Sequence, residues 1–243
     1  MNPVIELLNQ HRSIRRFTDR KIPDDLLRDL LQAGQSAATS SHVQAYSVIH
    51  VKDPANRETI AGLAGGQDYI ATCSDFLVFC ADMKRPADAA ERAGADATRG
   101  MTEQMLVASV DAALMAQNVV VAAESEGLGI CYIGGLRNNP QAVSDLLHLP
   151  EHVYPVFGLC LGYPDQSPEV KPRLPVDAIL KEDYYRDDQP HVATFDATMR
   201  DYYQARGSAQ KDTTWSQNLT PLFEHKVRPH MRDFLVSRGF EMK

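Results

Sequence analysis

The stretch MTEQMLVASVDAALMAQNVVVAAESE at residues 101–126 is the longest helical signal in the chain. Apolar side chains cover nearly every side of the predicted helix, so the helix must be buried on most faces. A large core and a subunit interface would both provide that burial, and the sequence leaves the choice open. Glycine commonly ends a helix, and Gly127 and Gly129 follow directly. The apolar positions are Met105, Val107, Ala108, Val110, Ala112, Ala113, Met115, Ala116, Val119, Val120 and Val121.

Continuous apolar runs on both sides of this helix predict buried strands. The clearest run is DFLVFCA at 75–81. Residues 84–100 are charged and interrupted by Pro86 and Gly94, so we expect a mobile excursion or a broken helix there. This irregular interleaving of strands and helices indicates the α+β class. Further strands are predicted at 46–51, 129–133 and 153–161, and helices at 2–10, 24–34, 54–63 and 140–148.

The chain changes character after Pro164. Pro168, Pro172 and Pro175 exclude regular structure and predict an extended arm. From about residue 192 the tail is helical but polar, with little core of its own. We therefore expect residues 1–243 to form a single domain whose C-terminal extension, from about 165, wraps around a partner subunit.

The overall composition excludes several classes of function. A formal net charge of −7 argues against a nucleic-acid binder, which needs a basic face. The N-terminus lacks the apolar stretch of a secretory leader, because Glu6 interrupts it. No segment is expected to supply the roughly 20 apolar residues that a membrane span needs. A cytoplasmic protein without a membrane partner is the resulting expectation.

The cysteines and histidines do not indicate a metal site. The four cysteines form no C-x-x-C pair, and Cys80, Cys131 and Cys160 lie in apolar runs typical of buried thiols. The eight histidines show no ligand spacing. Dinucleotide-binding, P-loop and nucleophile-elbow motifs are also absent. Without an evident acid, base or nucleophile, the sequence suits an enzyme whose cofactor carries the chemistry.

Two short basic stretches stand out in this acidic chain. In His11-Arg12-Ser13-Ile14-Arg15-Arg16, guanidinium groups and a hydroxyl could converge on one phosphate. The alternative is a solvated helix end, where cations are also favourable. Lys171-Pro172-Arg173 is a second basic pair on a backbone that proline restrains. Taken alone, it is more typical of a surface loop.

A pair of glycines follows the predicted strand at 129–133. In Tyr132-Ile133-Gly134-Gly135 the missing side chains would let a flat ligand approach the backbone amides. A tight turn is the competing interpretation. We favour the ligand because the polar residues 137–139 follow at once.

Seven colinear stretches resemble the NADPH-dependent, oxygen-insensitive nitroreductase and NADPH-flavin oxidoreductase family. That resemblance implies a mostly antiparallel sheet flanked by helices, in an intertwined homodimer with FMN bound at the subunit interface. It implies two-electron, ping-pong reduction of nitroaromatics, quinones or free flavins by NADPH. A flavin reductase that supplies reduced FMN and a non-catalytic flavin-binding protein are the alternatives. The stretches are HRSIRRFTD at 11–19, TSSHVQ at 39–44, GGQ at 65–67, YIGGLRNN at 132–139, FGLCLGYP at 157–164, KPRLP at 171–175 and RGS at 206–208.

The resemblance also implies roles for individual residues, with FMN rather than any side chain as the catalytic group. Arg12, Lys171 and Arg173 would hold the phosphate, and Arg15 would lie near the pyrimidine edge of the ring. The remaining FMN contacts would come from His11, Ser13, Ser41, Gln67, Tyr132, Ile133, Gly134 and Gly135.

NADPH and the electron acceptor would meet a third set of residues. By the resemblance, Arg206 selects NADPH, and Asn138 and Arg228 lie near the nicotinamide. This chain departs from the family at two places. His42 stands where relatives often carry an aromatic residue, over the ring face, and it would alter substrate choice. The Arg206 segment lacks one arginine of relatives, with Lys211 as the nearest substitute.

Overall fold

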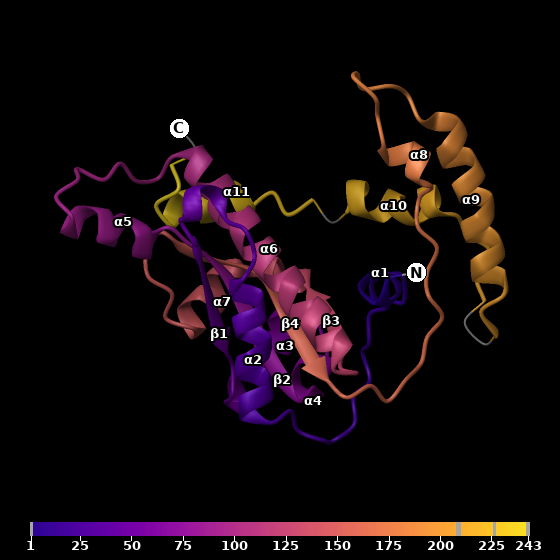
Figure 1. Ribbon diagram of the computed structural model, residues 1–243, viewed down its shortest axis with the longest axis horizontal. Coiled ribbons are helices and arrows are strands. Elements are labelled where there is room, and N and C mark those ends of the chain that lie inside the picture. Colours follow the sequence, from indigo (N-terminus) through magenta and orange to yellow (C-terminus); the bar gives the residue numbers. More distant parts are fainter. Residues whose placement is uncertain (1, 208–209, 226, 242–243) are drawn as a thin grey trace. The chain divides into compact units, whose positions relative to one another are not determined.

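The computed structural model describes residues 2–207, 210–225 and 227–241 (Figure 1). Its strands are β1 (Tyr46–His50), β2 (Asp75–Asp82), β3 (Gly129–Ile133) and β4 (Val153–Gly162). Its helices are α1 (Pro3–Asn9), α2 (Asp24–Gln35), η1 (Ser40–His42), α3 (Pro54–Leu63), α4 (Tyr69–Thr72), α5 (Lys84–Arg92), α6 (Thr102–Ser125), η2 (Gly134–Asn138), α7 (Pro140–Leu146), α8 (Val176–Ile179), α9 (Gln189–Gln204), α10 (Trp215–Glu224) and α11 (Met231–Ser237).

The four strands form one antiparallel sheet in the order β1-β2-β4-β3. Strand β2 lies inside the sheet and is buried along its whole length, as its continuous apolar run predicts. Its neighbour β4 pairs with it from Asp75 opposite Leu161 to Asp82 opposite Val153. The α+β class and the positions of all four predicted strands are confirmed.

Helix α6 packs one face against the sheet and against α2 (Figure 1). Its buried side chains, among them Met115 and Val119, belong to the main core. Leu106, Val110 and Leu114 lie four residues apart and are 51%, 54% and 44% exposed. The core therefore accounts for only one face of this apolar helix within a single chain.

The expectation that no segment is long and apolar enough to span a membrane is wrong. Among the described residues α6 is long and apolar enough, by length and composition alone, to pass that test. The core helix of a globular protein passes the same test when it is apolar on several faces. The packing of α6 against β2 and α2 places it in that class.

Residues 84–100 form a short helix and then an irregular segment, which matches the broken helix expected there. Helix α5 ends at Arg92, and Gly94 follows with φ of 95°. The irregular part is tied back to the helix by Arg99, whose guanidinium contacts Asp88 and Glu91, each at 2.8 Å.

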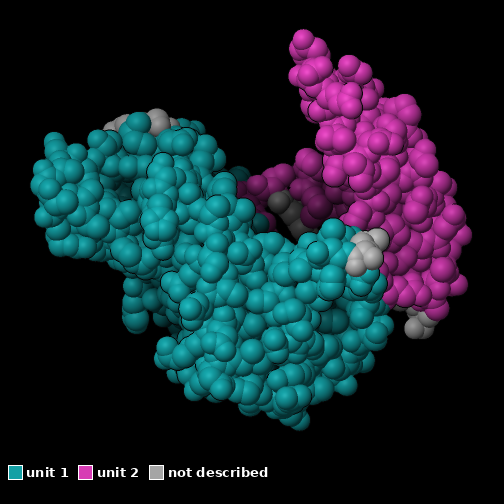
Figure 2. Space-filling view, viewed as in Figure 1, with its two compact units in different colours: residues 1–168, 229–243 teal, residues 169–228 magenta. Residues whose placement is uncertain are grey.

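The chain divides into two compact units (Figure 2). Unit 1 comprises residues 1–168 and 229–243, and unit 2 comprises residues 169–228. Unit 1 contains the sheet, and the returning segment packs there through Phe240, whose ring meets Tyr154 at 5.2 Å. The sequence did not predict this return. The division begins close to residue 165, where the sequence changes character.

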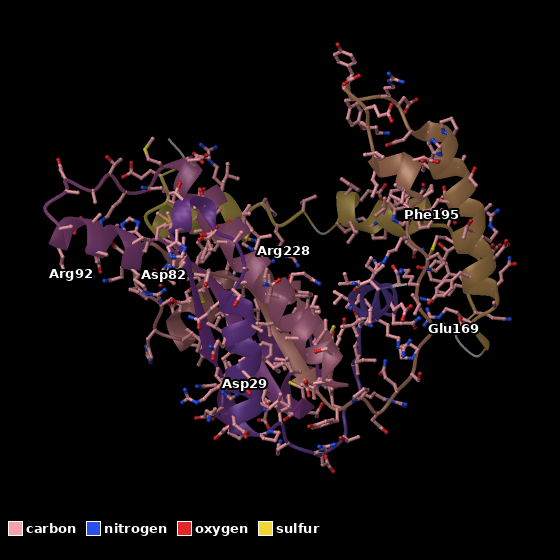
Figure 3. All side chains as sticks on the ribbon, in the orientation of Figure 1. Asp29, Asp82, Arg92, Glu169, Phe195 and Arg228 are labelled. Atoms are coloured by element: carbon pink, nitrogen blue, oxygen red, sulfur yellow. The ribbon has the colours of Figure 1, made fainter. Side chains whose placement is uncertain are left out.

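Unit 2 has a small core of its own. Phe195 (labelled in Figure 3), Met199 and Tyr203 are buried along α9. The ring of Trp215 in α10 packs against Phe195, with the ring centroids 5.8 Å apart. Phe223 of α10 is 77% exposed and takes no part in this core. Wrapping of this extension around a partner stays a prediction.

Candidate functional site

The basic stretch after α1 runs beside the edge strand β3. Ser13 forms a parallel bridge with Ile130, and the Ile14 amide donates to the Ile130 carbonyl at 2.8 Å. Ile14 is buried, and a Cβ placed on Gly129 would lie only 2.6 Å from its side chain. Glycine at 129 thus permits this close approach. The anchored backbone holds the neighbouring cations at the same edge of the sheet.

Arg12 lines a cavity of about 340 Å³ in unit 1. Glu124, Gly129 and Gln166 are among the residues that share this lining. A guanidinium in a cavity of this kind is suited to an anionic group such as a phosphate. The Glu124 carboxylate shares this lining, so an anion site at Arg12 stays a prediction.

His11 has a carboxylate partner that the sequence analysis missed. Its Nδ1 lies 2.6 Å from Oε1 of Glu124, near the end of α6, and the two side chains are 27% and 12% exposed. Only tertiary packing brings these residues together, because 113 positions separate them. The contact restricts the orientation of the imidazole ring.

Arg15 belongs to a second group of polar side chains. Burial raises the pKa of Tyr69, while a hydrogen bond from Arg15 acts in the opposite direction. Burial likewise raises the pKa of the Cys131 thiol, again against the Arg15 guanidinium. Arg15 therefore lies beside Tyr69 and Cys131, neither of which the sequence analysis had placed in the site.

Gln67 connects this group to the glycine pair. The Tyr69 hydroxyl donates to Oε1 of Gln67, and Nε2 of Gln67 donates to the Ala64 carbonyl at 2.7 Å. A Cβ on Gly135 would approach the Gln67 amide and would lie 2.5 Å from the Ala64 carbonyl oxygen. The structure thus brings Arg15, Gln67 and Gly135 together, and their role in FMN binding stays a prediction.

The residues around Gly134 make a turn at the end of β3. The Ile133 side chain is fully buried, so only its backbone could meet a ligand. Arg137 donates to the Val156 carbonyl, and the Asn139 side chain accepts from the Ala142 amide at 3.3 Å as the cap of α7. Side chains that we expected to crowd polar groups at a ligand are thus engaged in structure. Asn138 faces the Gly65 loop, 3.5 Å from a Cβ placed there.

Tyr132 lies in β3, just before this turn, and its ring packs edge-on against Phe157 with the ring centroids 5.1 Å apart. Its hydroxyl donates to Gln117 Oε1 at 3.4 Å. Burial raises the pKa of Tyr132, and the Glu124 carboxylate raises it further. Tyr132 therefore stays a neutral phenol that can line a flat ligand.

Ser41 and His42 lie on a strained, exposed loop. Their φ angles are 47° and 59°, in the left-handed region that favours glycine, and Gln44 is similar at 54°. This loop adjoins a different cavity, of about 350 Å³, whose lining includes Ser40 and the exposed α6 side chains Leu106 and Val110. The loop that carries Ser41 and His42 therefore borders the exposed apolar stripe of α6, formed by Leu106, Val110 and Leu114.

The remaining predicted cations all lie in unit 2. Nζ of Lys171 lies 5.4 Å from the ring centroid of Tyr203, and the Arg206 guanidinium lies 5.8 Å from that of Tyr202. Convergence of this set with Arg12 or with the glycine turn stays a prediction, and Ser208 of the RGS stretch lies outside the described residues. The set is Lys171, Arg173, Arg206, Lys211 and Arg228.

The cysteines are buried, as their apolar surroundings predict. Burial raises the pKa of the Cys80 thiol to about 12. Cys73 accepts a hydrogen bond from the buried Arg57 at 2.9 Å, and hydrogen bonding with Cys160 lowers its pKa. Among the described residues, no group of three or more histidine, cysteine or acidic side chains could hold a metal ion.

Known proteins resemble the chain along its whole length. A family profile described as "Nitroreductase family" matches residues 8–163, and "Nitroreductase family, C-terminal domain" matches residues 171–243. The oxygen-insensitive NADPH nitroreductase of Salmonella typhimurium is 42% identical over 99% of both chains. The FMN reductase (NADPH) of Bacillus subtilis is also 42% identical over 99% of both. The solved NADPH:FMN oxidoreductase of Vibrio harveyi, complexed with NAD+, matches 98% of both chains at 42% identity and a TM-score of 0.89.

Proposed function

The chain belongs to the nitroreductase family, and on that premise we propose that it uses NADPH to reduce nitroaromatics, quinones or free flavins in two-electron, ping-pong fashion on bound FMN. The observation that carries the proposal is the group formed by Arg15, Gln67 and Gly135 at the end of β3. It combines a cation and an amide beside the turn that ends β3, and these groups suit the polar edge of a flavin ring.

The chain has residues suited to the ring of FMN and residues suited to its phosphate. Gly135 is buried, and the Gln67 amide and the Ala64 carbonyl fill the place of its missing Cβ, so this glycine lets Gln67 pack against the turn. Arg12 lines a cavity and would bind the phosphate with Lys171 and Arg173. The smaller contacts would come from His11, Ser13, Ser41, Tyr132, Ile133 and Gly134.

FMN, when bound, would accept a hydride from NADPH and pass two electrons to the acceptor. The chain's own part is to bind, orient and stabilise charge. Arg15 would stabilise negative charge at the pyrimidine edge of the ring, because a fixed cation acts strongly where water is excluded. Arg15 is exposed in the single chain, so a bound ring would itself provide that exclusion.

NADPH would bind through the second basic group. Arg206 and Lys211 would take the 2′-phosphate, while Asn138 and Arg228 would lie near the nicotinamide. His42 would face the electron acceptor. Hydride donor and acceptor would use the same place in turn, which suits a broad range of acceptors.

A homodimer would complete the site. The stripe Leu106, Val110 and Leu114 is apolar and exposed, and it lies next to the loop that carries Ser41. A second copy that covers this stripe would bury it and bring the loop to the partner's flavin. The C-terminal extension would wrap the partner, and a cytoplasmic location completes the proposal.

The test uses the purified protein and two neighbouring arginines. The wild type should be yellow, and NADPH should bleach its flavin absorbance without oxygen. Arg15→Ala should weaken FMN binding at least tenfold. Arg16→Ala is the matched control, because Arg16 is exposed and its side chain donates to the Asp165 carbonyl at 2.9 Å instead. Equal losses in both variants would contradict the assigned role of Arg15.

Steady-state rates separate the alternatives. Faster turnover with nitroaromatics or quinones than with FMN supports the proposed acceptors. Faster turnover with free FMN would make the chain a flavin reductase that supplies reduced FMN. Stoichiometric bleaching without turnover would make it a non-catalytic flavin-binding protein.

A further inference from the structure

We propose that Asp111 is a positioning residue that holds the strained loop of residues 40–45 and so determines how His42 meets the electron acceptor. The inference deepens the proposed function and rests on it for the acceptor. The clamp itself is a property of the folded chain and can be measured without cofactor or substrate.

The loop adopts a backbone that its residues do not prefer. Ser41, His42 and Gln44 all have φ between 47° and 59°, and none of them is glycine. L-amino acids resist this region because Cβ comes too close to the backbone. Strain of this kind persists only where surrounding contacts enforce it, and it is common at functional sites.

Asp111 supplies the enforcing contacts at both ends of the loop. Its Oδ1 accepts the Ser40 amide at 3.0 Å, and its Oδ2 accepts the Ala45 amide at 3.1 Å. Within the loop, the Val43 amide donates to the Ser40 carbonyl at 2.8 Å. One carboxylate thus ties together two backbone positions that are five residues apart.

The loop in turn stabilises the carboxylate. Asp111 is 1% exposed in the middle of the apolar helix α6. In the part of the chain that the structure describes, it forms no ion pair. A buried carboxylate is costly unless hydrogen bonds satisfy it, and these two amides supply such bonds. Loop and acid therefore hold each other in place.

The strained backbone also determines the orientation of His42. The Gln44 side-chain amide lies 3.2 Å from Nε2 of His42. Both residues have left-handed φ, so release of the loop would separate them. Because His42 is exposed, few other contacts would keep its ring in place. Loss of the clamp should therefore change acceptor binding more than cofactor binding.

Amide-resolved hydrogen exchange of the wild type is the first measurement. Ser40 and Ala45 amides should exchange at least tenfold more slowly than the Ser41 amide, although Ser40 is exposed. Equal exchange at the three positions would overturn the clamp. This comparison needs no variant, so it holds even if substitution of Asp111 prevents folding.

Asp111→Asn is the second measurement, because it keeps the shape and removes one acceptor. It should speed exchange at Ser40 or Ala45 and raise KM for a nitroaromatic at least fivefold. Bound FMN should change less than KM, because Ser41 is the one FMN contact proposed in this loop and the others lie elsewhere. Asp82→Asn is the control: Asp82 (Figure 3) is 6% exposed, and its side chain accepts the Arg85 amide at 3.1 Å outside the loop. Only its backbone amide meets the loop, at the Ala45 carbonyl, and the substitution keeps that amide. It should leave loop exchange and KM unchanged.

The outcomes distinguish the two proposals. Faster loop exchange with unchanged KM would refute the role of Asp111 in acceptor binding. The same change of KM in Asp111→Asn and Asp82→Asn would show that a general loss of stability, and not the loop, causes the change. A wild type that retains no FMN would refute the proposed function, whereas protected Ser40 and Ala45 amides would still support the clamp.

Discussion

The contact between His11 and Glu124 supports a quantitative prediction about FMN binding. The two atoms lie 2.6 Å apart, and the side chains are 27% and 12% exposed. A hydrogen bond to a charged group contributes about 1.5–3 kcal/mol when buried, and an exposed ion pair at most about 1 kcal/mol. At this intermediate exposure the contact contributes about 1 kcal/mol. Without it, FMN binding would have to orient the ring, so we expect a coupling of up to about 1 kcal/mol, or roughly fivefold in Kd for FMN.

A double-mutant cycle measures that coupling. Kd for FMN would be determined by fluorescence quenching for the wild type, His11→Gln, Glu124→Gln and the double variant. Glu124→Gln also removes the direct repulsion between the carboxylate and the FMN phosphate. The same repulsion is lost when Glu124→Gln is made in the His11→Gln background, so it cancels from the cycle. Single effects that add within about 0.3 kcal/mol would refute the reasoning. Glu126→Gln, at the C-terminal end of the same helix, is the control and should have no coupling to His11.

Three further predictions concern the nucleotide, packing and pH. Arg206→Ala should raise KM for NADPH roughly tenfold to a hundredfold, from the loss of a charge-assisted bond of about 1.5–3 kcal/mol, and an equal rise for NADH would contradict the 2′-phosphate role. Gly158→Ala should lower the free energy of unfolding in urea by about 1–3 kcal/mol, because the new Cβ would lie 2.6 Å from the Phe76 ring; an unchanged midpoint would show that the sheet relaxes freely. Burial lowers the pKa of His50 below 6.5, so the unfolded chain binds the proton more readily, and stability should decrease as the pH falls below that value. His50→Asn should flatten this dependence, whereas a matching change in the exposed His148→Asn would rule out His50 as its source.

The local elements of this fold could be predicted because each has its own periodic signal. A continuous apolar run identifies β2, and glycine after a long apolar helix identifies the end of α6. The same pattern could not distinguish a core from an interface for α6, since Leu106 and Met115 are equally apolar. Asp111 carried a signal that was overlooked: a lone acid in an apolar helix contradicts the local pattern and so marks a special contact.

The sequence by itself determined the α+β class, the family, and the two basic stretches that begin near Arg12 and Lys171. Only the tertiary structure decided that Glu124 meets His11, that Tyr69 and Cys131 lie beside Arg15, and that residues 229–243 return to unit 1. Hydrophobic period and turn residues act over a few positions, so they can be read along the chain. Contacts between side chains more than 50 positions apart depend on how strands pair and helices pack, and no local pattern encodes that arrangement.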